Sequence, residues 1–147
     1  RRKRRKLPET PEVARLRQEA KAYLPIRLAQ LAAEYGFSYN QLRIKHNVSN
    51  WGSCSSKGNI NLNLNLMRLP QDLRDYVMVH ELCHLRHQDH GHAFHLLLEH
   101  VLTDNIIKCV ESGDQLALQL ARKIAASKAK YPMDYVLTRA IKQFSLV

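Results

Sequence analysis

The sequence predicts one domain of the α+β class, in which a small antiparallel sheet packs against a buried helix and further helices surround them. Three observations lead to this prediction. The segment from about residue 70 to 85 is apolar on almost every side, as expected of a helix in the middle of a domain. Residues 42–48 and 59–66 alternate apolar and polar side chains, which is typical of strands. The stretches before and after them repeat apolar residues at helical spacing.

The composition agrees with a single globular domain. A chain of 147 residues with 45% hydrophobic and 24% charged residues is ordinary for such a protein. No apolar run has the length of a membrane span and no signal peptide is visible, so we expect no membrane association. The three cysteines, Cys54, Cys83 and Cys109, are an odd number without a pairing pattern. They are interpreted as small buried residues in a reducing compartment, and the expected location is the cytoplasm.

A basic segment precedes the domain. Residues 1–9 are predicted to form a flexible arm and residues 10–147 the single domain. The hexamer Arg1–Lys6 holds six of the 23 basic residues, and the 17 others are nearly balanced by 13 acidic ones. Such an arm is a candidate for binding nucleic acid or an acidic membrane surface, and it is equally well explained as a solvated flank.

The first helix is predicted from Thr10 onwards. Thr10 can cap it, Pro11 suits the first helical position, and an apolar stripe continues until Gly36. Pro25 removes one backbone donor within this stretch, which predicts either a kink or two abutting helices. We interpret this segment as a scaffold that packs on the sheet.

The predicted strands follow, with a turn at residues 55–58 between them. The second strand carries asparagine at positions 59, 61, 63 and 65, although asparagine is depleted in strands. One explanation is the solvated face of an antiparallel hairpin. The other is a sheet edge on which an extended peptide lies. Trp51 is expected in the core, and Gly52 is expected to permit a bulge or a close backbone approach.

The buried helix contains the pattern H-E-x-x-H at residues 80–84. Residues four apart lie on one helix face, so the imidazoles of His80 and His84 can bind one metal ion. Glu81 is offset by one position and can take a proton from a water molecule without being a ligand. The sequence therefore predicts a catalytic zinc site with Glu81 as the general base, although the residues do not distinguish zinc from other divalent ions.

A third ligand is needed if one coordination position is to stay open. His90 is the predicted ligand. A continuing helix would carry it about 240° away from the ligand face, so the helix has to stop first. Gly91 suits the left-handed conformation that ends helices. The nearby side chains of His92, His95 and Glu99 are the alternatives to His90.

The rest of the chain reads as helices. An apolar helix follows Gly91, a basic amphipathic segment runs to Lys130, and a short helix begins near Pro132. The basic side chains there can contact phosphates or simply face solvent. Tyr131 or Tyr135 is a candidate to stabilise an oxyanion, and Asp75 or Asp89 is a candidate partner for a ligand imidazole.

Several of these motifs, in the same order, resemble the YgjP-like metallopeptidases, which are zincins related to the SprT-like proteases. The resemblance covers about residues 12–101 and rests on four motifs: Trp51-Gly52-Ser53-Cys54 with the strand after it, Asp75-Tyr76-Val77, the H-E-x-x-H pattern, and His90-Gly91 with Phe94.

The resemblance implies a small zincin-like α+β fold, bound zinc, and hydrolysis of peptide bonds in a peptide or protein substrate. It matches His80, His84 and His90 to the metal ligands and Glu81 to the catalytic base. Family members usually carry a bulky aromatic residue after the position of Phe94, whereas this chain has His95. The helical tail of residues 103–147 lies beyond the resemblance.

The predicted function is zinc-dependent hydrolysis of peptide bonds. One alternative is a SprT-like, DNA-associated protease that a basic surface recruits to protein bound to DNA. The other is a non-catalytic, zinc-stabilised binding module. The position of Glu81 beside the metal argues against this second alternative, because a purely structural site has no use for it.

Overall fold

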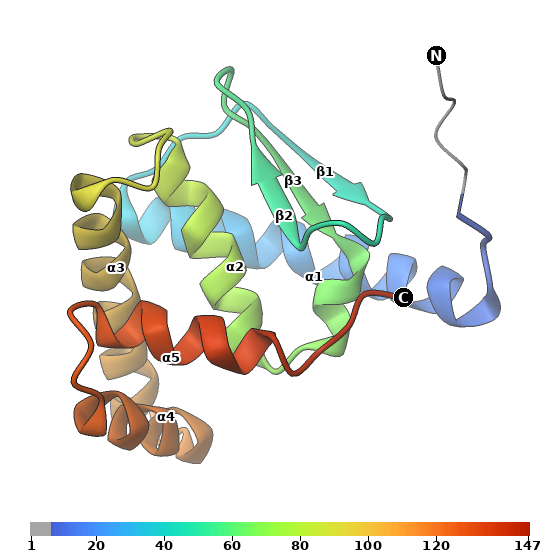
Figure 1. The fold of residues 1–147 in the computed structure, drawn as a ribbon. Helices are drawn as coiled ribbons and strands as arrows, with labels where there is room; N and C mark the ends of the chain where they lie inside the picture. Colours follow the sequence, from blue (N-terminus) through green and yellow to red (C-terminus); the bar gives the residue numbers. More distant parts are fainter. Residues whose placement is uncertain (1–6) are drawn as a thin grey trace.

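The computed structural model describes residues 7–147, which form five α-helices, one 3-10 helix and a three-stranded sheet (Figure 1). The basic hexamer of the predicted arm, residues 1–6, lies outside the described residues. In chain order the elements are α1 (Pro11–Tyr35), β1 (Gln41–Lys45), β2 (Gly52–Cys54), β3 (Asn59–Asn63), η1 (Leu64–Arg68), α2 (Gln71–His84), α3 (His92–Glu111), α4 (Gln115–Ala126) and α5 (Pro132–Ile141).

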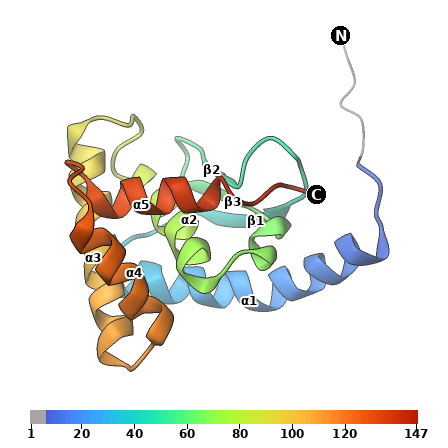
Figure 2. The same cartoon turned by 60° about the horizontal axis from the view of Figure 1, so that its bottom comes forward.

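Helix α1 is the base on which the sheet and α2 rest (Figure 2). The Thr10 hydroxyl accepts a hydrogen bond from the Val13 amide at 3.2 Å, and Gly36 ends the helix with a φ of 72°. The helix continues through Pro25, so the prediction of two abutting helices is wrong. Pro25 and Lys21 are both exposed, and water can therefore satisfy the Lys21 carbonyl that loses its partner.

The sheet has the strand order β1-β3-β2, so β3 is its central strand. Strand β3 pairs in parallel with β1, with Gln41 opposite Asn59, and antiparallel with β2, with Gly52 opposite Leu62. The sheet is therefore mixed, and the prediction of a purely antiparallel one is wrong in this respect. The asparagine-rich strand is not an edge either, because both of its sides are paired. Within the described chain, β2 is the edge strand on the side of α2.

The asparagines of this strand have a structural explanation. Asn63 is buried, and its side-chain amide nitrogen donates to the backbone carbonyls of Asn47 and Asn50 at 2.9 and 3.0 Å. These bonds hold the loop between β1 and β2 against the end of β3. Asn61 donates to the Ser53 hydroxyl of β2 at 3.1 Å. The polar face of β3 thus supplies hydrogen bonds that fix its neighbours, rather than a purely solvated face.

The alternating pattern beyond Asn63 does not continue as a strand. Residues Leu64–Arg68 form the 3-10 helix η1, in which Leu64 and Leu66 are fully buried. The Asn63 carboxamide oxygen accepts a hydrogen bond from the Asn65 amide at 2.9 Å, which starts this turn. A local side-chain bond therefore ends the strand earlier than the apolar alternation indicates.

Helix α2 lies in the middle of the molecule, as predicted, between the sheet on one side and α3 and α5 on the other (Figures 1 and 2). Its buried residues surround almost the whole helix. The α+β class and the buried central helix are therefore confirmed. Within residues 7–147, no helix has the length and apolarity that crossing a membrane requires.

Candidate metal centre

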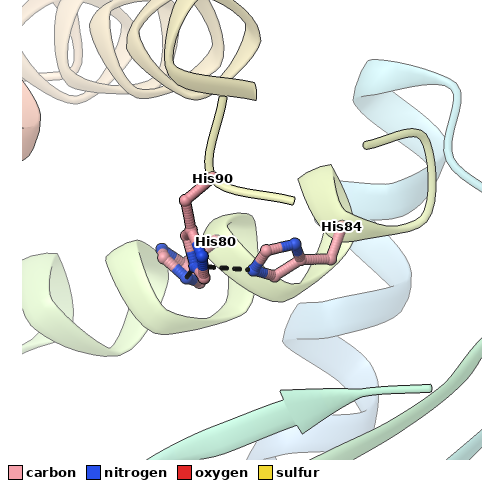
Figure 3. A group of neighbouring side chains, drawn as sticks. All are labelled: His80, His84 and His90. Carbon is pink, nitrogen blue, oxygen red and sulfur yellow. Dashed lines mark hydrogen bonds between the residues drawn. The ribbon is translucent and has the colours of Figure 1, made fainter. Parts of the chain in front are cut away.

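Three imidazoles converge at the C-terminal end of α2 (Figure 3). His80 and His84 come from one face of the helix, and His90 comes from the loop that follows it. The Nε2 atom of His90 lies 3.1 Å from that of His84 and 3.4 Å from that of His80. The ligand nitrogens of a tetrahedral zinc ion, at 2.0–2.1 Å from the metal, are about 3.3 Å apart. The spacing of these nitrogen atoms therefore fits one shared metal ion.

The loop after α2 brings His90 to the cluster. The helix ends in tight bonds, with the Leu85 amide donating to the Leu82 carbonyl and the Arg86 amide to that of Cys83, each at 3.1 Å. The Asp89 carboxylate accepts a hydrogen bond from the Gly91 amide at 3.1 Å and shapes the turn. Gly91 has a φ of −75° and is the N-cap residue that precedes α3, so the predicted left-handed helix end at this residue is wrong. The predicted helix stop before His90 is confirmed.

The backbone sets the orientation of His84. Its Nδ1 atom lies 2.9 Å from the His87 carbonyl oxygen, to which it donates as the tautomer that leaves the Nε2 lone pair free for a cation. Sequence reasoning named Asp75 or Asp89 as imidazole partners, and the structure assigns both to other contacts. Asp89 bonds the Gly91 amide, and Asp75 forms a buried ion pair with Arg27.

The pKa of His80 is lowered to about 4, mainly by burial and also by the neighbouring His84 and His90. The Nδ1 atom of His80 is buried and has no hydrogen-bond partner within residues 7–147. Burial also lowers the pKa of His84. Neutral imidazoles with free lone pairs are the form that binds a metal ion.

Phe94, at the start of α3, forms the floor of the cluster. Its ring stacks on that of His84 with centroids 4.4 Å apart and an angle of 18°. The same ring meets His80 and His90 edge-on, at 5.0 and 5.1 Å. Phe94 is fully buried, so it fixes all three imidazoles from one side. Its sequence position gave only the expectation of an apolar helix residue, because this contact depends on how α3 packs on α2.

Glu81 lies beside the cluster, on the side of the sheet. Its side chain is buried, and burial raises its pKa to about 7. A Cβ atom on Gly52 of β2 would come within 3.2 Å of the Glu81 Cγ and 3.3 Å of Oε2. Gly52 therefore leaves the space that the carboxyl group occupies, in agreement with the close approach expected for this glycine.

The alternative ligands are engaged elsewhere. The Glu99 carboxylate accepts hydrogen bonds from the Met133 and Asp134 amides, at 2.9 and 3.2 Å, and so caps α5. His92 bonds the Tyr131 hydroxyl, and His95 lies beside Asp134. Among the described residues, His80, His84 and His90 are the one group with donor atoms close enough to hold a metal ion.

The two tyrosines proposed for oxyanion stabilisation do not reach the three imidazoles in this structure. The Tyr131 hydroxyl is bonded to His92, and that of Tyr135 accepts a hydrogen bond from Arg139 at 2.6 Å. Tyr135 is largely exposed.

Comparison with known proteins extends these observations. Residues 11–108 match the family model described as "YgjP-like, metallopeptidase domain". The fold is similar to a crystal structure of the metallopeptidase zymogen abylysin of Pyrococcus abyssi, with a TM-score of 0.50 and 17% sequence identity. That match covers 82% of this chain and 95% of the other. No curated protein sequence matches significantly.

Proposed function

Since this chain belongs to the YgjP-like metallopeptidase family, we propose that it is a zinc peptidase in which His80, His84 and His90 hold the metal and Glu81 is the general base. Membership of the family makes it a metal-dependent peptidase. The convergence of three Nε2 atoms beside a buried carboxyl group is the observation that supports the finer assignment. Zinc is the proposed metal because three imidazoles with an open fourth position are typical of catalytic zinc.

The bound ion would polarise the scissile carbonyl and make the attacking water more acidic. Glu81 would take the proton of that water during the attack and pass it to the leaving amine. Burial raises the pKa of this carboxyl group in the metal-free chain, and the same burial favours its protonated form when it accepts that proton. Because Gly52 has no side chain, β2 leaves room for the carboxyl group at this position.

The edge strand β2 is the proposed support for an extended substrate. It lies on the side of the sheet that faces α2, next to the Glu81 carboxyl group. A peptide that paired with the free side of β2 would bind through its main chain and would pass the site with little demand on sequence. The role of peptide-binding edge, which the sequence suggested for the asparagine-rich strand β3, is therefore proposed for β2 instead.

The decisive variant is Glu81→Gln, which keeps the size of the side chain and removes its basicity. We expect the parent chain to bind one zinc ion and cleave members of a peptide library. The variant should bind zinc equally well and lose all measurable cleavage. Zinc content by mass spectrometry and cleavage by fluorescence report the two properties separately. Full activity in the variant would refute the role of Glu81, and cleavage that persists in His90→Ala with unchanged zinc affinity would refute the ligand set.

The location and the nucleic-acid alternative remain predictions. A cytoplasmic location is expected from the unpaired cysteines. The hexamer Arg1–Lys6 lies outside the described residues, so a DNA-directed protease is tested in solution. A steep decrease of DNA affinity with rising salt in the full chain, lost when the hexamer is replaced by glutamines, would support this alternative.

A further inference from the structure

A second polar cluster lies beside the metal centre, where the start of α5 meets α2 and α3. It consists of His95, Asp134, Tyr76 and Tyr131, and it is named the α5 cluster here. Helix α5 passes across α2 in both views of the fold (Figures 1 and 2). The Glu99 carboxylate stabilises the first turn of α5 by accepting hydrogen bonds from the backbone amides of residues 133 and 134. The position of Asp134 is therefore fixed by the backbone of α5.

The carboxylate of Asp134 contacts three side chains, of which Thr138 donates a hydrogen bond to Oδ1 at 3.2 Å. Its Oδ1 atom accepts a hydrogen bond from the Tyr76 hydroxyl at 2.7 Å, and its Oδ2 atom lies 3.2 Å from Nδ1 of His95. The Nδ1 atom is buried, and the contact has ion-pair distance without hydrogen-bond alignment. A small rotation of the imidazole would complete the bond. Asp134 is thus placed to orient the ring of His95.

The other edge of that ring faces outward. The side chain of His95 is 28% exposed although its Nδ1 atom is buried, so the exposed part lies on the edge away from Asp134. The ring of Tyr131 stacks on it with centroids 5.0 Å apart and an angle of 23°. The imidazole is therefore held between an aromatic face and a carboxylate, with one edge free to meet a ligand.

The α5 cluster is connected directly to the metal centre. Phe94 contacts the His95 ring edge-on at 5.5 Å, and the same phenyl ring packs against all three converging imidazoles. Tyr76, whose hydroxyl binds Asp134, meets the ring of His80 at 6.0 Å. The α5 cluster consequently borders the metal centre on the side of α5, while β2 and Glu81 border it on the side of the sheet.

Asp134 has a structural role of its own, because it accepts hydrogen bonds from Tyr76 and Thr138. The buried Nδ1 atom of His95, in contrast, has no hydrogen-bond partner within residues 7–147. Such an unpartnered nitrogen costs free energy that an apolar side chain at this position would avoid, so packing alone does not explain the imidazole. An oriented imidazole beside a polarised carbonyl is suited to donate a hydrogen bond to its oxygen.

We propose that His95, held by Asp134, is a further catalytic residue that donates a hydrogen bond to the carbonyl oxygen of the scissile peptide as negative charge develops there. Asp134 acts through His95 as a positioning residue. The inference rests on the proposed peptidase function. It assigns a role to α5, which lies outside the residues matched by the family model.

The test uses His95→Phe and His95→Leu, which both lack a donor, with His100→Phe as the matched control, because His100 is an exposed histidine of the same helix. The probes are the best substrate found in a peptide library, a phosphinic analogue of it that mimics the tetrahedral transition state, and one cleavage product. Removing a donor to an oxyanion should lower kcat/KM by about 10²–10³-fold. Affinity for the phosphinic analogue should fall in parallel, while zinc content and product affinity stay unchanged.

Asp134→Asn is then compared in the wild-type and His95→Phe backgrounds. If Asp134 acts through His95, its replacement lowers kcat/KM in the first background and has little effect in the second. Should one His95 variant fail to fold, the other carries the measurement.

The inference is overturned by near wild-type kcat/KM in a folded His95 variant. It is equally overturned by loss of zinc, by equal losses of affinity for analogue and product, or by an Asp134→Asn effect that is the same in both backgrounds. Each of these results leaves the zinc peptidase assignment standing if the parent chain cleaves peptides. A parent chain that binds zinc and cleaves no peptide refutes the proposed function and this inference together.

Discussion

Two consecutive residues of the site, His80 and Glu81, respond to burial in opposite directions. The pKa of the imidazole falls to about 4 and that of the carboxyl group rises to about 7, because burial disfavours the charged form of each. In the metal-free chain both groups therefore tend to be neutral near pH 6. At higher pH the ionisation of the buried Glu81 carboxyl group destabilises the metal-free chain.

This difference predicts the pH dependence of the metal-free chain. Glu81 ionises near pH 4.5 when unfolded and near 7 when folded, so the free energy of unfolding decreases as the pH rises through that interval. Protonation of His80 has the opposite pH dependence, since the free energy of unfolding decreases as the pH falls from about 6.5 to about 4. Glu81→Gln removes the first term alone and should stabilise the metal-free chain by about 3 kcal/mol at pH 8.

Urea unfolding in the presence of EDTA at several pH values measures this effect. The stability difference between Glu81→Gln and the parent should vanish below about pH 3.5, where the parent carboxyl group is protonated in both states. A difference that stays constant from pH 4.5 to 8 would show that charge burial at Glu81 is not its cause.

Gly52 gives a prediction about the same carboxyl group. A methyl group at this position would meet the Asn61 carbonyl oxygen and the Glu81 Cγ, each at 3.2 Å. The backbone oxygen is held in the sheet, so the Glu81 side chain has to move. Gly52→Ala should keep its zinc and lose up to about 10²-fold in kcat, as expected for a misplaced catalytic group. Ser53→Ala is the control, because it adds no atom towards Glu81, and equal kinetic losses in both variants would contradict this explanation.

At the scale of elements, the helices and the strands β1 and β3 were predictable, whereas β2 and the pairing of the strands were not. Helix boundaries have local causes, such as the Thr10 cap and the Gly36 turn. The partners of a strand are set by distant segments. Alternation around Ile60 indicates which face is buried, yet it says nothing about which strands lie on either side. The asparagine bonds that hold the loop before β2 have no local sequence signal for the same reason.

The candidate site also has features with local causes, which the sequence predicts, and features that depend on packing between distant segments. The spacing of His80 and His84 and the helix stop before His90 are local features, and they predicted the convergence that the structure contains. A close approach at Gly52 was expected, but the partners of Gly52 and Phe94 depend on packing between elements and could not be predicted from the sequence. The α5 cluster joins His95 to Asp134, which lies more than 30 positions further along the chain, so the sequence did not indicate that these two side chains meet.

Helices α1, α2 and α3 are joined by one buried ion pair. Arg27 of α1 binds both oxygens of Asp75 in α2, at 3.0 and 2.8 Å, and Asn105 of α3 donates to the same carboxylate at 3.1 Å. The Asp75 side chain is only 3% exposed. Arg27→Met would leave this carboxylate buried without its counter-charge and should cost about 3–5 kcal/mol of unfolding free energy.

Chemical unfolding measures this cost, and α1 offers a matched control. Arg17 forms a similar pair with Glu9, but both side chains are substantially exposed, at 31% and 49%. Arg17→Met should therefore change stability by no more than about 1 kcal/mol. Similar losses for the two methionine variants would contradict the assignment of the effect to burial.

For the whole molecule, the metal is expected to add stability without being required for folding. The core is a single cluster that includes residues of α1, β3, α2 and α3, and most of it lies away from the three imidazoles. Thermal unfolding with and without EDTA should show a folded metal-free chain with a lower Tm. At a zinc concentration about 1,000-fold above Kd the difference corresponds to about 4 kcal/mol. The difference in Tm between zinc and EDTA should be the same in Glu81→Gln and much smaller in His90→Ala. A chain that is unfolded in EDTA would refute the expectation.

The three imidazoles proposed as metal ligands are held by different kinds of structure, and we expect this difference to determine how long an ion stays bound. His80 and His84 stand on a buried helix, but His90 is exposed and belongs to a loop without helical hydrogen bonds. Such a segment opens far more often than the core unfolds. Transfer of the ion to a chelator should consequently be limited by local opening of residues 85–91. The rate of this transfer should far exceed the rate of global unfolding and depend little on the stability of the rest of the fold.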